Sequence, residues 1–361
     1  MRREQQVELP AYDTQVVNAV RQEEAGTIQG AKLILSGGLV AFPTETVYGL
    51  GANGLDGAAV SKIFLAKGRP ADNPLIEHIA KKSDVRKLWR RMPKQAQILM
   101  DTFWPGPLTL IAQKSDLVPD EVTAGLDTVA VRMPQNRTAR ALISKAGVPI
   151  AAPSANRSGR PSPTTAQHVL DDLKGRIPLI IDGGPCKYGV ESTVLSLAGE
   201  PTILRPGAVT REMLSALIGE VQVADSILQP MKEGETAASP GMKYKHYAPN
   251  AEVVIVLGTP EQAARKINSL VREAEAEGKR CEIAATEQTK LYYKGKKHVV
   301  LGDRNEPVTL CANLFSALRE MDEHADVIFA EGIEAKDEGL AYMNRLLRAA
   351  GFHVIDAGAH E

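Results

Sequence analysis

The chain has 361 residues, 43% hydrophobic and 24% charged, so it can hold two globular domains and lacks a disordered or fibrous composition. Its 43 basic and 44 acidic side chains exclude an overall basic field that would hold nucleic acid or an anionic membrane non-specifically. A polar N-terminal stretch and apolar runs of only strand length predict a cytoplasmic protein with no leader sequence and no membrane span.

Residues 1–225 alternate short apolar runs with amphipathic stretches, which is typical of an α/β domain. We expect strands at 38–43, 74–80, 107–113, 128–133, 148–152, 177–182, 190–197 and 201–205. We expect helices at 23–35, 57–67, 94–103, 137–146, 165–174 and 210–218, with Asp56 as an N-cap and Thr164 with Gln167 as a capping box. Frequent Pro and Gly favour a twisted mixed sheet over a parallel one.

Residues 226–250 are rich in Lys, Gly, Ser and Pro and show no sustained period, so we interpret them as a linker. A second α/β pattern fills 251–361. Its expected strands are 251–258, 280–285, 298–301, 327–333 and 353–357, and its expected helices are 260–277, 309–324 and 339–350. This order predicts a smaller, Rossmann-like second domain.

The segment PTETVYGLGANG, 43–54, follows the first long apolar run and places three glycines in GxGxxG spacing. A dinucleotide-binding turn is one interpretation, although that motif requires glycine directly at the turn from strand to helix. The favoured interpretation is a polar loop that offers Thr44, Glu45, Thr46 and Tyr48 to a ligand at the end of a buried strand. The third interpretation is a glycine-rich turn whose role is only structural packing.

The segment KGRPADNPL, 67–75, places Lys67 and Arg69 in a turn after a predicted helix, where both cations could contact one anion. Favourable charge at the helix C-terminus is the alternative explanation. The sequence contains no GxxxxGK[ST] phosphate-binding loop, so individual side chains would have to hold a triphosphate.

In the segment VPIAAPSANRSGRPSPTT, 148–165, Ser154 and Asn156 emerge at the end of an apolar strand. The loop is not a GxSxG nucleophile elbow, so Ser154 is expected to be a hydrogen-bond donor. Arg132 lies in the strand TVAVRMP, where a half-buried arginine needs an anionic partner.

The run KKSDVRKLWRRMPK, 81–94, carries seven cations and one acid, so with Trp89 it could contact RNA or form a solvated helix face. The histidines show no spacing suited to a metal, and HExxH is absent, so we expect no zinc site built by the protein.

Seven segments in order resemble the YrdC-domain family, and the two-domain layout resembles the long threonylcarbamoyl-AMP synthases of that family. They are PTETVYGLG (43–51), KGRPADNPL (67–75), PGPLT (105–109), TVAVRMP (128–134), APSANRSGRPSPT (152–164), STV (192–194) and SPGMKYKHYAP (239–249). Glu77 departs from the pattern, because an apolar residue is expected there.

The resemblance implies a nucleotidyltransferase that converts ATP, L-threonine and bicarbonate or CO₂ into threonylcarbamoyl-AMP and pyrophosphate. The product would be used by downstream tRNA threonylcarbamoyltransferase machinery in tRNA processing, to make N6-threonylcarbamoyladenosine at tRNA position 37. Direct tRNA binding is not required. Two other functions stay open: a carbamoyltransferase, whose known relatives carry zinc-finger and acylphosphatase regions absent here, and a non-catalytic RNA-binding module.

The resemblance also implies site roles. Threonine contacts are expected at Thr46, His78, Arg132, Ala152 and Ser192. ATP contacts are expected at Lys67, Arg69, Asn73, Thr128, Ser154, Asn156, Ser162, Arg205 and Tyr247. Lys67 and Arg69 would stabilise charge on the leaving pyrophosphate, without a protein nucleophile. Mg²⁺ would arrive on ATP, without ligands from the protein, and the linker would cover the cleft as a lid.

Overall fold

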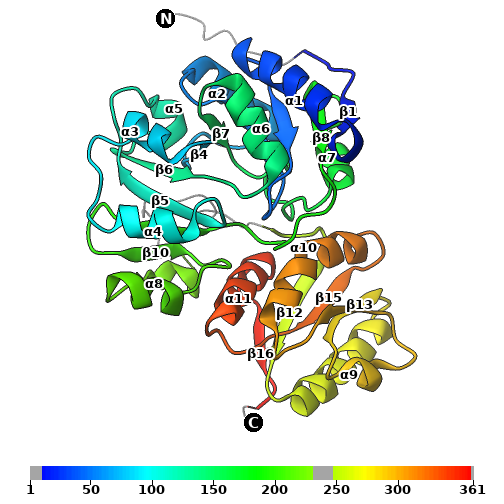
Figure 1. The fold of residues 1–361 in the computed structure, drawn as a ribbon. Helices are drawn as coiled ribbons and strands as arrows, with labels where there is room; N and C mark the ends of the chain where they lie inside the picture. Colours follow the sequence, from blue (N-terminus) through cyan, green and yellow to red (C-terminus); the bar gives the residue numbers. More distant parts are fainter. Residues whose placement is uncertain (1–9, 231–246, 359–361) are drawn as a thin grey trace, which may run out of the picture.

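The computed structural model describes residues 10–230 and 247–358. It contains two β-sheets, of which the first belongs to the N-terminal part of the chain and the second to the C-terminal part (Figure 1). Within the described residues, no helix has the length and apolar character needed to cross a membrane.

The first sheet has eleven strands in the order β1-β8-β2-β3-β7-β4-β6-β5-β9-β10-β11. Their bounds are β1 Gln15–Asn18, β2 Val40–Phe42, β3 Gly49–Asn53, β4 Ile76–His78, β5 Leu108–Gln113, β6 Thr128–Arg132, β7 Ile150–Ala152, β8 Leu179–Asp182, β9 Thr193–Ser196, β10 Thr202–Arg205 and β11 Gln222–Val223. The sheet contains parallel pairs, such as β4 with β6, and antiparallel pairs, such as β5 with β6, so the predicted mixed sheet is confirmed.

Helices cover both faces of this sheet. They are α1 Ala19–Leu35, α2 Gly57–Lys67, α3 Val85–Leu88, α4 Ala96–Phe103, α5 Asp120–Thr123, α6 Arg137–Ala146, α7 Ala166–Leu173 and α8 Arg211–Ile218. The alternation along β2 explains the two cores, because Val40 and Phe42 pack with residues of α1 and α6 while Ala41 packs with residues of α2 and α4. The amphipathic pattern of each helix therefore has a sheet face to bury.

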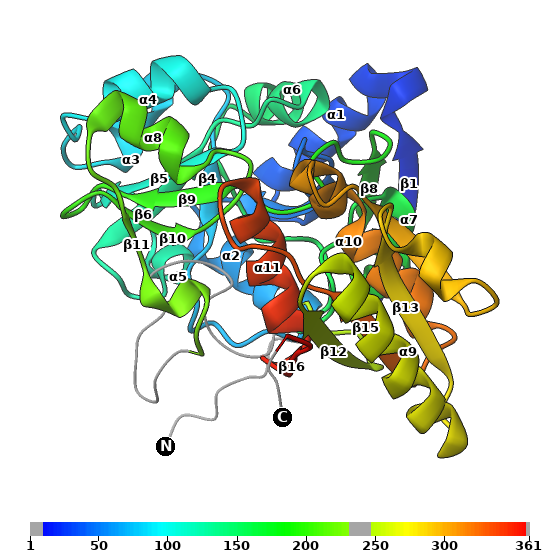
Figure 2. The same ribbon diagram turned by 90° about the horizontal axis from the view of Figure 1, so that it is seen from below.

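The second sheet has five strands, all parallel, in the order β14-β13-β15-β12-β16. The strands are β12 Glu252–Leu257, β13 Cys281–Thr286, β14 His298–Gly302, β15 Val327–Glu331 and β16 Val354–Asp356, and the helices are α9 Pro260–Ala276, α10 Pro307–Asp322 and α11 Glu338–Ala349. This all-parallel α/β sheet confirms the expected class of the second domain. Helices α10 and α11 lie toward the first sheet, and α9 covers the other face (Figures 1 and 2).

The conformation of the glycine-rich segment after β2 does not match a dinucleotide-binding turn. Residues 44–48 form a loop, but Gly49 and Gly51 lie in β3, an antiparallel strand between β2 and β7. A Cβ atom at Gly51 would lie 2.6 Å from the Ile150 side chain and 2.8 Å from that of Phe42. These glycines let strands pack closely, so the dinucleotide interpretation is wrong.

Candidate functional site

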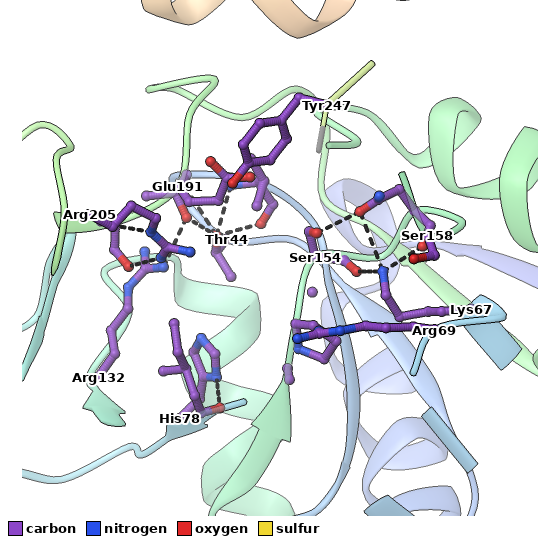
Figure 3. A pocket seen from close by; sticks show the side chains of 18 of the residues that line it. Thr44, Lys67, Arg69, His78, Arg132, Ser154, Ser158, Glu191, Arg205 and Tyr247 are labelled. Atoms are coloured by element: carbon purple, nitrogen blue, oxygen red, sulfur yellow. Dashed lines mark hydrogen bonds between the residues drawn. The ribbon is translucent and has the colours of Figure 1, made fainter. Parts of the chain in front are cut away.

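A cleft opens on the first sheet where several strands end, and most of the predicted site residues line it (Figure 3). The space between its walls amounts to about 700 Å³, including the part open to solvent. Its lining includes Thr44, Thr46, Lys67, Arg69, His78, Arg132, Ala152, Ser154, Asn156, Ser158, Gly159, Glu191, Ser192, Arg205 and Tyr247.

Sheet register brings His78, Arg132 and Ser192 to one end of the cleft. Strands β4 and β6 run parallel and pair His78 with Arg132 at their last residues. Thr109 on β5 pairs with Arg132, and its hydroxyl lies 2.8 Å from that of Ser192. Residues far apart in sequence thus meet because their strands end at the same edge.

Arg132 is buried and holds the 44–48 loop in place. Its Nη2 donates to Glu45 Oε1 at 2.5 Å, its Nη1 to Thr46 Oγ1 at 2.9 Å and its Nε to Gly106 O at 3.3 Å. Burial alone would raise the pKa of Glu45, but the charge and hydrogen bond of Arg132 keep it below its ordinary value. A guanidinium has five N–H donors, so two remain beyond these three bonds for an incoming anion.

His78 is a neutral hydrogen-bonding group in this cleft. Burial, with the nearby charge of Arg132, lowers its pKa to about 3, so the ring is uncharged at neutral pH. Its Nδ1 lies 3.0 Å from Ile76 O and 3.3 Å from Ile150 O, and two carbonyl neighbours require this nitrogen to carry the proton. The other ring nitrogen, Nε2, is therefore a hydrogen-bond acceptor.

The opposite end of the cleft is built around Lys67, the last residue of α2. Helix α2 begins at the predicted N-cap Asp56 and ends at Gly68, whose φ of 61° turns the chain after Lys67. Lys67 Nζ donates to Ser154 O and Asn156 O, both at 2.5 Å. Burial, followed by the charge of Arg69, holds the pKa of Lys67 well below its ordinary value.

Arg69 and Ser154 lie at the same end of the cleft as Lys67 (Figure 3). The Arg69 Nη2 donates to Asn73 O at 2.8 Å, and its guanidinium lies 5.7 Å from the centre of the Phe64 ring. Ser154 Oγ donates to Asn156 Oδ1 at 2.5 Å. Burial lowers the pKa of Arg69 to about 10, which leaves it charged at neutral pH.

The third wall contains Glu191, Ser192 and Arg205, with the Tyr247 ring above them (Figure 3). Arg205 donates from Nε to Ser192 O at 3.0 Å and from Nη2 to Ser192 Oγ at 3.1 Å. Tyr247 stacks on Phe315 of α10, with ring centres 5.0 Å apart. Side chains from both parts of the chain therefore meet at the cleft.

Three predicted ATP contacts do not line the cleft. Thr128 begins β6, at the opposite end of that strand from Arg132. Asn73 accepts the Arg69 hydrogen bond through its backbone oxygen. Ser162 Oγ donates to Glu191 Oε1 at 2.5 Å, behind the wall. Their contacts with ATP stay predictions.

The sequence reasoning missed Glu191, which lines the cleft, although it precedes the predicted Ser192. Glu191 lies inside the predicted strand 190–197, and an acidic side chain there, directly before Ser192, was the signal that could have identified it. Of the predicted linker lid, residues 231–246 lie outside the described residues, and Tyr247 is the described part that reaches the cleft.

The structure corrects one part of the RNA-binding interpretation of residues 81–94. Trp89 is buried against Trp104, with ring centres 6.5 Å apart, so it is not available to stack on RNA bases. The cations Lys81, Arg86 and Lys87 are exposed. Across residues 10–230 and 247–358, no three His, Cys, Asp or Glu side chains cluster so as to hold a metal ion.

Comparison with known families divides the chain into two matched regions. Residues 32–207 match the family model described as "Telomere recombination". Residues 209–351 match the model described as "Threonylcarbamoyl-AMP synthase, C-terminal domain".

Full-length relatives give the same result. A threonylcarbamoyl-AMP synthase of Pyrococcus abyssi is 49% identical over 95% of this chain and 99% of its own. That of Bacillus subtilis is also 49% identical, over 91% of this chain and 93% of its own. The crystal structure of Pyrococcus abyssi Sua5 complexed with L-threonine aligns with a TM-score of 0.87 and 46% identity, covering 97% of this chain and 99% of that chain. The chain therefore belongs to the threonylcarbamoyl-AMP synthase family, in its two-domain form.

Proposed function

We propose that this chain joins L-threonine, bicarbonate or CO₂, and ATP into threonylcarbamoyl-AMP and releases pyrophosphate. The observation that carries the proposal is a single cleft in which Arg132, Lys67, Arg69 and Arg205 surround a space beside hydroxyl groups. These side-chain cations would hold the phosphates in place of the backbone N–H groups of a phosphate-binding loop.

The proposed threonine site is the end of the cleft with Thr46, His78, Arg132, Ala152 and Ser192. Arg132 can give two N–H donors to the threonine carboxylate while Glu45 and Thr46 hold its guanidinium. The neutral His78 offers Nε2 to an N–H of the amino group. Both contacts orient the nitrogen that reacts.

The proposed reaction has two steps. The threonine nitrogen adds to the carbon of CO₂ and loses a proton, which gives a carbamate. A carbamate oxygen then attacks the α-phosphorus of ATP, and the bond from that phosphorus to the bridging oxygen breaks, which releases pyrophosphate. Charge grows on the departing phosphates, where Arg69 and Lys67 stabilise it. The carbamate is short-lived in water, so the reaction requires the cleft to be closed during turnover.

We propose that Mg²⁺ enters with ATP as part of the substrate. Glu191, a carboxylate that lines the cleft, is paired with Arg345, and the nearby Glu45 is paired with Arg132. Neither is available as a metal ligand without breaking a buried ion pair. Bound to the phosphates, the ion would neutralise their charge.

The linker and the product also belong to this proposal. Residues 226–250 would separate a catalytic domain, 1–225, from a second domain, 251–361, and would cover the cleft. Support comes from Tyr247, which lines it. The mixed anhydride would pass to a tRNA threonylcarbamoyltransferase for modification of adenosine at position 37.

Incubation of pure protein with ATP, Mg²⁺ and ¹³C-bicarbonate tests the function. We expect pyrophosphate release only when L-threonine is added, together with ¹³C in the adenylate. Omission of threonine is the control. Equal release without threonine would show a plain ATP pyrophosphohydrolase and reject the proposal.

A further inference from the structure

Arg345 of α11 reaches from the second sheet into the wall of the cleft. Its side chain is fully buried, and its Nε donates to Glu191 Oε2 at 2.7 Å. Its Nη2 donates to Pro206 O at 2.9 Å, next to Arg205. The charged side chain of one domain is therefore placed behind the cleft of the other.

Glu191 is a negative charge in a cleft whose proposed substrate is a polyanion. Its other oxygen accepts from Ser162 Oγ at 2.5 Å, which fixes the carboxylate in the wall. Burial alone would raise the pKa of Glu191, but the charges of Arg345 and Arg205 keep it below its ordinary value. Glu191 is thus ionised, and without Arg345 only Arg205 would balance its charge, so this wall would be less favourable for ATP.

Arg345 also contacts the tyrosine that covers this wall. Its guanidinium lies 5.8 Å from the centre of the Tyr247 ring, and that ring also packs against Phe315, with ring centres 5.0 Å apart. The Tyr247 backbone has a φ of 64°, a left-handed conformation that a non-glycine residue adopts only at some cost. Contacts from α10 and α11 thus hold the ring in a strained segment.

We infer that Arg345 is a positioning residue for ATP: it neutralises Glu191 and holds that carboxylate and Tyr247 in the cleft wall. This inference rests on the proposed function, because it takes ATP to be the anion in the cleft. It gives the second domain a defined part in the first domain's site. Substrate does not need to touch Arg345 for this role.

A second arginine of the same interface provides a matched control. Arg319 of α10 donates to Asp172 at 2.7 Å, and Asp172 does not line the cleft. Both ion pairs are buried and both join the two parts of the chain. Asp172 and Arg319 also act on Lys67 through their charges. Only the Arg345 pair contains a carboxylate that lines the cleft, so only the loss of Arg345 should be reversed by Glu191→Gln.

The test compares Arg345→Met, Glu191→Gln, their double variant, Arg319→Met, and Arg319→Met with Glu191→Gln. Steady-state KM and kcat for ATP and calorimetric binding of a non-hydrolysable ATP analogue are measured in the full-length protein. We expect Arg345→Met to raise the KM for ATP and the analogue Kd by about tenfold or more, with a smaller change in kcat. Glu191→Gln should return both to within about threefold of the unsubstituted protein.

Glu191→Gln should give no such recovery in Arg319→Met. If Arg345→Met does not fold, Arg345→Lys replaces it, with a smaller KM increase that Glu191→Gln must also cancel. An unchanged KM in the Arg345 variant, or an increase that persists in the double variant, overturns the inference. Absence of threonine-dependent pyrophosphate release in the unsubstituted protein would instead reject the proposed function, while analogue binding would still test the charge balance.

Discussion

Arg69 is the cation whose removal best tests the phosphate end of the cleft. The Asn73 carbonyl and the Phe64 ring hold its guanidinium, and Arg69 lines the cleft, so its charge can act on a ligand there. We expect Arg69→Ala to weaken ATP use by about 1.5 to 3 kcal/mol, the range of a hydrogen bond to a charged group. The measurement is kcat/KM for ATP at saturating threonine.

Arg86→Ala is the control, because Arg86 is an exposed arginine on α3 that does not line the cleft. Its kcat/KM should match that of the unsubstituted protein. Equal kcat/KM for Arg69→Ala and the unsubstituted protein would remove Arg69 from the phosphate site.

Most of the site residues could be predicted because they stand at strand or helix ends within recognisable motifs. Eleven of the fourteen predicted residues line the cleft, and Arg132 shows why this was achievable: it ends a strand whose neighbours also end there. Arg345 could not be predicted. It lies in an ordinary amphipathic helix, and only the packing of two distant segments brings it to Glu191.

Strand β4 contains a buried carboxyl group, because the side chain of Glu77, between Ile76 and His78 in sequence, is fully buried. Its neighbours in register are Val131 and Ala151, and neither carboxylate oxygen has a hydrogen-bond partner among the described residues. A Cβ atom at Gly54 would lie 2.0 Å from Glu77 Oε2, so the glycine makes room for the carboxylate. Burial raises the pKa of Glu77 to about 8, which means that the folded protein holds it protonated at neutral pH.

Glu77→Leu is therefore expected to stabilise the protein, by about 1 to 3 kcal/mol near pH 8. The unfolded chain ionises Glu77 near its ordinary pKa of 4.5, whereas the folded protein does so only near 8. Between these values the folded state binds the extra proton, so the unsubstituted protein loses stability as pH rises. Denaturant unfolding at several pH values should show the Leu variant's advantage growing across this window.

Glu77→Gln is the matched control, since it removes the ionisation but keeps a polar group of the same shape. It should lose the pH dependence while gaining less stability than the leucine variant. A stability difference between Glu77→Leu and the unsubstituted protein that stays constant with pH would contradict the assignment.

Elements with a strong period were predicted well, and those formed by tertiary pairing were missed. Helices α2 and α6 have the predicted bounds, and α2 has the predicted N-cap, Asp56. Helix α7 is capped by Thr165, one residue after the predicted Thr164, because neighbouring threonines offer the same hydroxyl. Strand β3, with the sequence GLGAN, has weak intrinsic β propensity and exists because β2 and β7 pair with it.

At the scale of the whole molecule, the buried pair of Arg319 and Asp172 is a main connection between the two sheets. Asp172 accepts from Arg319 Nη2 at 2.7 Å and Nη1 at 3.2 Å, and from the Arg157 backbone N–H at 3.1 Å. Arg319 also donates to Pro161 O, at 2.5 Å. Loss of Arg319 would leave this buried carboxylate with the half-exposed Arg160, whose Nη1 lies 3.4 Å from Asp172 Oδ1, as its counter-charge, at a cost of up to about 3 to 5 kcal/mol.

We therefore expect Arg319→Met to lower the melting temperature and to divide thermal unfolding into two transitions, because each sheet has its own core and the docking contact is weakened. Calorimetry of the full-length protein measures this. Adding Asp172→Asn to Arg319→Met should recover part of the loss, since the amide removes a buried charge that Arg160 alone would balance, while it can still accept from the Arg157 N–H. One transition at the unsubstituted melting temperature would show that the apolar contacts alone hold the two sheets together.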